Sequence, residues 1–116
     1  MSAEPTEAEL AARYRPRIEA ELAELEIATA ATSGDRRPVE LDQQSVGRLS
    51  RMDAMQGQAM ATAIEARRAQ RRAALRAALV RIAEGEFGFC ARCGEFIGDG
   101  RLTVDPAAML CVACAQ

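Results

Sequence analysis

Four cysteines in the last 27 residues constrain this chain more than any other feature of its sequence. They are Cys90, Cys93, Cys111 and Cys114, in the pattern C-x2-C-x17-C-x2-C. Each C-x-x-C loop presents two sulfurs from one tight turn, and two such loops can supply four tetrahedral ligands at about 2.3 Å from Zn²⁺. Four thiolates leave no open coordination position, so this spacing predicts a structural zinc that replaces a core too small to form alone.

Two other uses of these cysteines stay open at this point. A tetrahedral set of four sulfurs also suits iron in a rubredoxin-like cage. Alternatively, the thiols could react by disulfide exchange and serve as a redox sensor. In a reducing compartment, clustered cysteines favour metal over disulfides, so zinc is the preferred interpretation. The surrounding apolar residues then predict a satellite core over the cluster, made of Phe87, Phe89, Phe96, Ile97, Leu102 and Val104.

The composition favours helices over strands. Among 116 residues, alanine occurs 25 times and aromatic residues make up only 3%, which argues against a β-sandwich and for helices lined with small side chains. There is no histidine, the commonest general base, and no phosphate-binding loop or nucleophile motif stands out. We therefore expect a mainly α protein that is not an enzyme.

The first 32 residues predict one helix. Thr6 and Glu9 have the spacing of a capping box, and a single apolar stripe follows at steps of three and four. Its members are Leu10, Tyr14, Ile18, Leu22 and Leu25. The turn-forming, charged segment from Ser33 to Pro38 ends this helix.

A second helix of about 40 residues is predicted to run from an N-cap at Asp42 to about Ala83, without a proline. A stripe of mostly small residues along it predicts a close seam with the first helix, so that the two fold into a long antiparallel coiled-coil hairpin. The predicted seam consists of Leu49, Met52, Ala59, Ala63, Ala66, Ala73, Ala77 and Val80.

The charges support this pairing. Residues 1–30 carry seven glutamates and three arginines, whereas residues 48–81 carry eight arginines and two acidic residues. A basic stripe on the second helix, Arg67, Arg68, Arg71, Arg72 and Arg76, has two interpretations: a solvated face that pairs with the glutamates, or a phosphate-binding face for nucleic acid. We favour the first, and the net charge of −2 gives no overall attraction to nucleic acid.

The sequence starts without a basic segment followed by an apolar run, and it has no stretch of about 20 apolar residues that could span a membrane. A cytoplasmic location without membrane contact is the expectation.

The run from Ala83 to Ile97, with Cys90, Cys93, Gly94 and Glu95 inside it, resembles the C4 zinc finger of the DksA/TraR transcription regulators. Arg101-Leu102, Pro106, Cys111 and Cys114 continue the similarity. The resemblance covers residues 80–114 closely, and the preceding hairpin matches the family's architecture. It divides the chain into a hairpin, residues 1–84 with its tip near 33–47, and a zinc finger, residues 85–116.

The resemblance implies a regulator that binds RNA polymerase directly, without contact to promoter DNA, and places the tip of its coiled coil in the secondary channel. Family members carry an acidic D-x-x-D-x-A motif at this tip. Here the matching stretch keeps Asp42, has Ser45 instead of the second acid and Gly47 instead of the alanine, and these three residues are the predicted polymerase-contacting positions. A zinc-dependent nucleic-acid binder that uses the basic stripe and a thiol redox sensor stay open as alternatives. Whether a small-molecule effector such as a nucleotide binds is also open.

Overall fold

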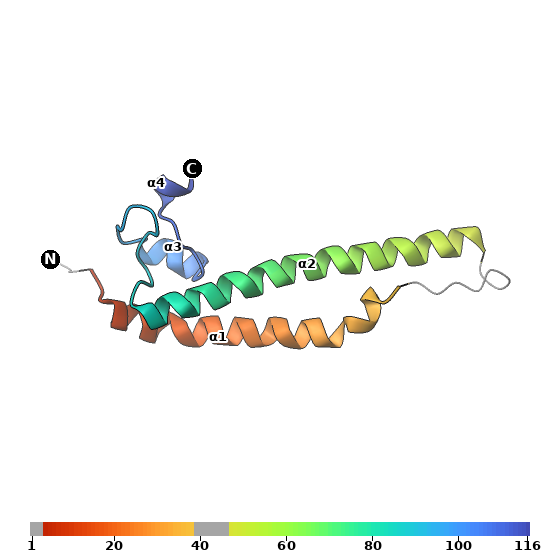
Figure 1. The fold of residues 1–116 in the computed structure, drawn as a ribbon, viewed down its shortest axis with the longest axis horizontal. Coiled ribbons are helices and arrows are strands. Elements are labelled where there is room, and N and C mark those ends of the chain that lie inside the picture. Colours follow the sequence, from red (N-terminus) through yellow and green to blue (C-terminus); the bar gives the residue numbers. More distant parts are fainter. Residues whose placement is uncertain (1–3, 39–46) are drawn as a thin grey trace.

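The computed structural model describes residues 4–38 and 47–116, and these residues are mainly helical (Figure 1). The order is α1 (Glu7–Ala31), a 3₁₀ turn η1 (Ser33–Arg36), α2 (Arg48–Glu84), α3 (Asp99–Val104) and α4 (Val112–Ala115). The described residues contain no strand, only an isolated antiparallel bridge between Phe89 and Phe96. The mainly α prediction is therefore confirmed.

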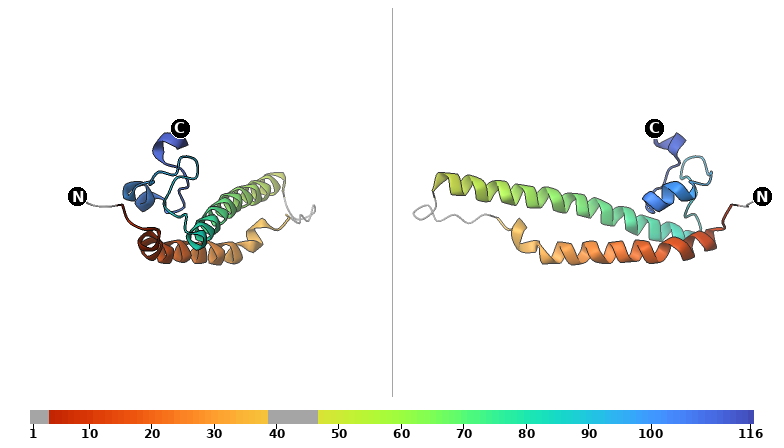
Figure 2. Two further views of the ribbon diagram at one scale, coloured as in Figure 1. Left: turned by 60° about the vertical axis from the view of Figure 1, so that its left-hand side comes forward. Right: turned by 180° about the vertical axis from the view of Figure 1, so that it is seen from behind.

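The two long helices lie side by side as an antiparallel hairpin, and the remaining elements pack at one end of it (Figures 1 and 2). The molecule measures 73 × 28 × 21 Å. α3 and α4 lie at the end where α1 begins and α2 ends, which we call the base of the hairpin. The opposite end of α2 lies far from the cysteines.

α1 follows its predicted pattern closely. The Thr6 side chain accepts a hydrogen bond from the backbone N–H of Glu9 at 3.2 Å, as an N-cap does. Leu10, Tyr14 and Ile18 are buried on one face, and Pro16 lies inside the helix without ending it.

α2 begins later than predicted. Its N-cap is Gly47, so the prediction that Asp42 caps this helix is wrong. The helix ends as predicted near Ala83, because Gly85 takes the left-handed conformation (φ +74°) in which its N–H reaches the carbonyl of Ile82.

The predicted seam of α2 is also wrong. Of its eight residues only Ala77 is half-buried, and the others are exposed, Leu49 and Val80 by 77% and 53%. A second stripe with the same 3/4 spacing is covered instead: Gln58, Ala61, Glu65, Arg68, Arg72, Leu75, Leu79 and Ile82. Both stripes have helical periodicity. Near the base, Leu75, Leu79 and Ile82 of the second stripe bury more apolar surface than alanines would. Further along, Glu65 pairs with Arg68 and Arg72 and accepts a hydrogen bond from Thr29 of α1.

The core lies at the base of the hairpin and joins both long helices to the cysteine-containing segment. It is formed by the buried residues Leu10, Tyr14, Ile18, Leu75, Ala78, Ile82, Phe87, Cys90, Ile97, Leu102 and Ala107. Phe87, Ile97 and Leu102 were predicted to belong to a core, whereas Val104 is 83% exposed, so its predicted burial is wrong.

Gly88 allows this core to close. Its φ is +91°, and a Cβ at this position would lie 2.5 Å from Cδ1 of Leu10. Any other residue would thus meet both an unfavourable backbone conformation and a clash with α1.

None of the described helices combines the length and apolar character that crossing a membrane requires.

Candidate metal centre

The first cysteine pair lies in a short loop between residues 88 and 97. The backbone N–H of Cys90 donates to the carbonyl of Glu95 at 2.7 Å, and that of Ile97 donates to Gly88 at 2.9 Å. The turn between them closes through Gly94, whose φ is +79° and whose N–H donates to the carbonyl of Cys90 at 2.9 Å. This loop turns the buried Cys90 and the exposed Cys93 toward the same point.

The second pair starts a short helix. Cys111 is the N-cap residue of α4, and Cys114 lies in its only turn. The N–H of Ala115 donates to the carbonyl of Cys111 at 3.0 Å, as Gly94 does to Cys90 in the first loop. A bond from the Ala91 N–H to the carbonyl of Met109, at 2.8 Å, holds the two loops together.

The four sulfurs meet in one place. The Sγ atoms of Cys90, Cys93, Cys111 and Cys114 all lie within 4.8 Å of one another, and Cys93 Sγ is 3.7 Å from Cys111 Sγ. In a tetrahedral site with Zn–S bonds of about 2.3 Å, neighbouring sulfurs are about 3.8 Å apart. The donor set and its spacing therefore fit a structural Zn²⁺.

The sulfurs differ in how readily they lose their protons. Backbone N–H groups of Cys111 and Cys93 that point at Cys90 lower the pKa of this thiol to about 5. Side-chain hydrogen bonds with Cys111 and Cys90 raise the pKa of Cys114 to about 12. Four thiolates at this distance need a cation between them, because like charges disfavour full ionisation.

The base of the hairpin holds the cysteine-containing segment through polar contacts that the sequence pattern did not reveal. Arg71 of α2 donates to Oε1 of Glu21 in α1 at 3.0 Å and to Oδ1 of Asp105 at 2.7 Å. Arg13 of α1 pairs with Asp99 of α3 at 2.7 Å. These partners are distant in sequence, so no local motif could have indicated them.

The charges in this contact reinforce one another. The hydrogen bond from Arg71 lowers the pKa of Glu21. Burial opposes ionisation of Asp105, but hydrogen bonds from Arg71 and from the N–H of Ala107 outweigh it and lower the pKa of this carboxyl group. One guanidinium thus joins α1, α2 and the segment after α3.

The basic stripe forms ion pairs rather than an open surface. Arg68 and Arg72 pair with Glu65, Arg71 with Glu21 and Asp105, and Arg76 with Glu26. Arg67 is exposed. The interpretation of this stripe as a face that pairs with acidic residues is favoured over that of a phosphate-binding face.

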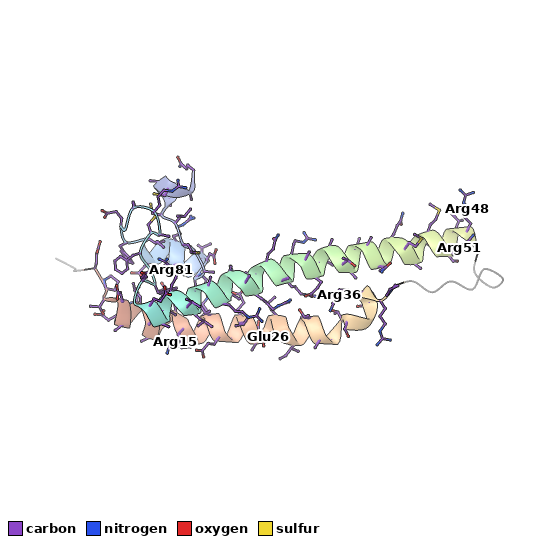
Figure 3. The ribbon with its side chains drawn as sticks, viewed as in Figure 1. Arg15, Glu26, Arg36, Arg48, Arg51 and Arg81 are labelled. Carbon is purple, nitrogen blue, oxygen red and sulfur yellow. The ribbon has the colours of Figure 1, made fainter. Side chains whose placement is uncertain are left out.

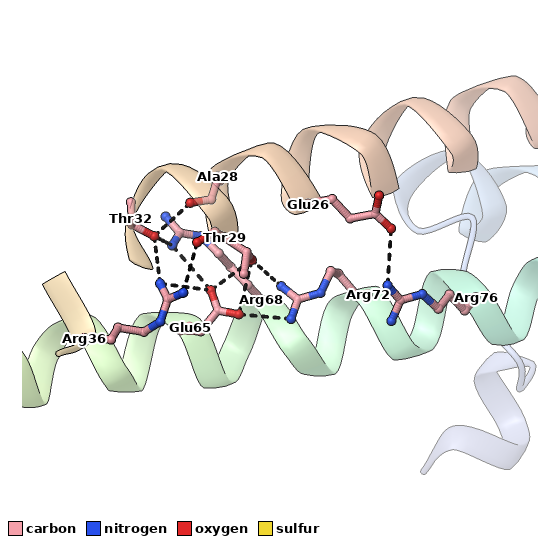
Figure 4. A network of polar contacts seen from close by, with 9 residues as sticks. All are labelled: Glu26, Ala28, Thr29, Thr32, Arg36, Glu65, Arg68, Arg72 and Arg76. Carbon is pink, nitrogen blue, oxygen red and sulfur yellow. Dashed lines mark hydrogen bonds and ion pairs between the residues drawn. The ribbon is translucent and has the colours of Figure 1, made fainter. Parts of the chain in front are cut away.

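Glu65 is the centre of a polar network inside the hairpin (Figure 4). Its side chain is 15% exposed, and it accepts hydrogen bonds from Thr29 at 3.0 Å and from Arg72 at 3.0 Å. Arg36 and Arg68 lie 3.6 and 3.7 Å from the same carboxylate. Burial raises the pKa of Glu65, but the bonds from Arg72 and Thr29 outweigh it, so the net shift is downward.

The predicted tip falls largely outside the described residues. Asp42 and Ser45 belong to the undescribed segment 39–46. Gly47 is exposed and precedes α2. Arg48 and Arg51 follow it at the end of the hairpin opposite to Arg81 (Figure 3).

Fold and site together define a class: a long helical hairpin whose base carries a finger of four cysteines. Residues 85–116 match the family model of the prokaryotic dksA/traR C4-type zinc finger. The resemblance of this segment to the DksA/TraR family is therefore confirmed, and the donor set is that of a zinc finger.

A solved structure agrees with this at the level of the fold. The structure of transcription factor DksA2 from Pseudomonas aeruginosa superposes with a TM-score of 0.67 at 20% sequence identity, over 94% of this chain and 79% of that one. No curated protein sequence matches this chain significantly. The fold of this chain is thus similar to that of DksA2, with a DksA/TraR-type zinc finger at residues 85–116.

Proposed function

We propose that this chain is a non-enzymatic, zinc-binding transcription regulator that binds RNA polymerase and inserts the end of its hairpin into the secondary channel. The observation that carries the proposal is the shared architecture: a DksA-type fold along 94% of the chain together with a family-type zinc finger at residues 85–116. The proposed division is a hairpin of residues 1–84 and a finger of residues 85–116, in the cytoplasm.

The shape of the hairpin suits a probe that reaches into a channel. α2 has 37 residues, which corresponds to about 55 Å at 1.5 Å per residue. Its free end lies far from the finger (Figure 1), so the finger and base can dock on a protein surface while the other end enters it. We propose Asp42, Ser45 and Gly47 as the residues that act at this end.

In the finger, we propose that Cys90, Cys93, Cys111 and Cys114 are the zinc ligands. The metal would supply no reaction chemistry, because four thiolates fill its coordination sphere. Its contribution is to hold the two cysteine loops together.

The alternatives are less well supported. A nucleic-acid binder that uses the basic stripe would need free guanidinium groups, yet four of its five arginines pair with carboxylates. A redox sensor does not require the hairpin, which is the larger part of the molecule.

Affinity for core RNA polymerase tests the proposal directly. Purified protein should bind core enzyme and bind free duplex DNA weakly at physiological salt. Tight DNA binding that weakens steeply with rising salt would instead support the basic stripe.

Asp42→Asn separates docking from regulation, because asparagine keeps the shape of aspartate and removes its charge. We expect this variant to bind polymerase as the wild type does but to lose its effect in a reconstituted transcription assay. Glu24→Gln, at an exposed position of α1, is the control with the same charge change. Full activity of Asp42→Asn would contradict the role of the charged tip but not polymerase binding.

A further inference from the structure

Two arginines hold the backbone immediately before the two cysteine pairs. Nη2 of Arg81 donates to the carbonyl of Phe89, the residue before Cys90, at 2.5 Å. Nε of Arg101 donates to the carbonyl of Leu110, the residue before Cys111, at 2.8 Å. The two loops therefore receive the same kind of support at the same position.

The equivalence extends through each loop. The carbonyl of Cys90 accepts from the N–H of Gly94 at 2.9 Å, and that of Cys111 accepts from the N–H of Ala115 at 3.0 Å. In both loops, the carbonyl before the first cysteine is bound by a guanidinium and the carbonyl of that cysteine by a backbone amide. The direction of the Cα–Cβ bond of each first cysteine is thus fixed from both sides.

The two arginines come from different parts of the molecule. Arg81 lies in the last turns of α2, its side chain is only 12% exposed, and the same nitrogen also donates to the carbonyl of Glu86 at 3.0 Å. Arg101 lies in α3. One loop is therefore fastened to the hairpin and the other to the finger itself.

Charge strengthens these bonds. Hydrogen bonds with an ionised donor are shorter and stronger than neutral ones. Each guanidinium binds the carbonyl next to a proposed ligand of a cluster that would carry a net charge of −2 with four thiolates and one Zn²⁺. Groups around the ligands of a metal site orient those ligands, and their loss typically weakens metal binding about 10- to 100-fold.

We propose that Arg81 and Arg101 are positioning residues of the zinc site, which set the two cysteine loops for tetrahedral coordination, and that Arg81 makes zinc retention depend on the base of the hairpin. Neither side chain needs to touch the metal. Their role is to limit how far each loop can relax when a sulfur dissociates.

Zinc transfer to a chromogenic chelator tests this proposal in the full-length protein. We expect Arg81→Gln and Arg101→Gln each to release zinc about 10- to 100-fold faster than the wild type. Arg92→Gln is the matched control: it removes the same charge from an exposed position between Cys90 and Cys93, and its release rate should stay within about twofold of the wild type. Arg81→Lys and Arg101→Lys, which keep one charged donor, should recover part of the loss.

A second measurement separates positioning from loss of folding. With Co²⁺ in place of zinc, the wild type should show the absorption bands of a tetrahedral four-sulfur site, and the two glutamine variants should show altered bands while the helical circular dichroism of the hairpin is retained. A variant that takes up no Co²⁺ even in excess supports the proposal as well, provided that Arg92→Gln loads normally. Release rates and spectra equal to those of Arg92→Gln in both variants would overturn it.

Discussion

At the scale of single residues, Arg71 links distant parts of the chain, because it bridges the carboxylates of Glu21 and Asp105. Its side chain is 30% exposed, whereas Arg76, five residues further along α2, is 56% exposed and pairs, among the described residues, only with Glu26. The two arginines resemble each other in sequence context but differ in what they hold.

This difference predicts unequal costs of substitution. Arg71→Gln leaves Glu21 and Asp105 without their shared partner, and we expect it to lower the free energy of unfolding by about 1 to 2 kcal/mol. Arg76→Gln breaks one exposed ion pair and should cost less than about 1 kcal/mol. Urea unfolding of both variants measures the difference, and equal midpoints would show that the bridge does not secure the finger.

The lowered pKa of Glu65 predicts a pH dependence with a definite sign. A carboxyl group whose pKa is lower in the folded state stabilises the protein above its ordinary pKa of 4.5 and loses this contribution as the pH falls through the folded-state value. Glu65→Gln should therefore be less stable than the wild type at pH 7, and the gap should close as the pH falls below 4.5.

Loss of zinc in acid lowers the stability of every variant over the same pH range. The difference in stability between a variant and the wild type therefore cancels this effect. Thermal unfolding from pH 7 to pH 3 is the measurement, and Glu24→Gln, at an exposed position of α1, should show no such gap. A gap for Glu65→Gln that stays constant across this range would mean that the carboxylate acts through packing alone.

At the scale of the elements, the periodic apolar pattern identified the buried face of α1 but not that of α2. The stripe of α1 was predicted correctly because its large apolar residues, such as Leu10, Tyr14 and Ile18, gather on one face, with exposed Ile27 as the exception. On α2 alanines recur at helical spacing on several faces, so periodicity alone could not choose between the two stripes. The sequence pattern did not indicate Glu65 as a seam residue, since a charged residue in a seam becomes recognisable only when its partners, such as Thr29 of α1, are known.

The corrected seam predicts which substitutions matter. Leu75 is fully buried, and Leu75→Ala should cost about 2 to 5 kcal/mol. Ala63 and Ala66 are exposed, so Ala63→Leu and Ala66→Leu should each stay within about 0.5 kcal/mol of the wild type. Helical circular dichroism during unfolding tests both expectations, and strong destabilisation by either leucine would restore the alanine seam.

The four cysteine ligands were more predictable than the contacts that hold the finger and its loops in place. Ligand spacing is local, so four cysteines in two pairs indicate a site before any fold is known. Contacts such as Arg13 to Asp99, which are 86 positions apart in sequence, depend on how the finger lies against the hairpin. Arg81 and Arg101 likewise contact backbone carbonyls, which leave no signature in residue types.

At the scale of the whole molecule, the finger and the hairpin share one core, so removal of the metal should affect both. Tyr14 is the only tyrosine and there is no tryptophan. Its ring lies 6.0 Å from that of Phe87, and its hydroxyl donates to Asp99 at 3.3 Å. The intrinsic fluorescence of the protein therefore reports on the contact between α1 and the finger.

We expect a strong chelator, or the substitution Cys93→Ser, to expose Tyr14 to acrylamide quenching and to lower the melting temperature of the hairpin. Most of the helical circular dichroism should remain, because α1 and α2 contact each other away from the base as well (Figure 4). Tyr14 that stays shielded without metal would show that the finger folds without zinc.

The close fit of Gly88 against Leu10 has a consequence for the order of events during synthesis. Leu10 is synthesised long before Leu102, yet both line the same core. Chains are synthesised at about 5 to 20 residues per second. The apolar face of α1 is therefore exposed to other proteins for seconds before the finger residues that pack on it, such as Phe87 and Leu102, are synthesised. A nascent chain stalled between residues 84 and 102 should therefore bind general chaperones more strongly than the released protein does.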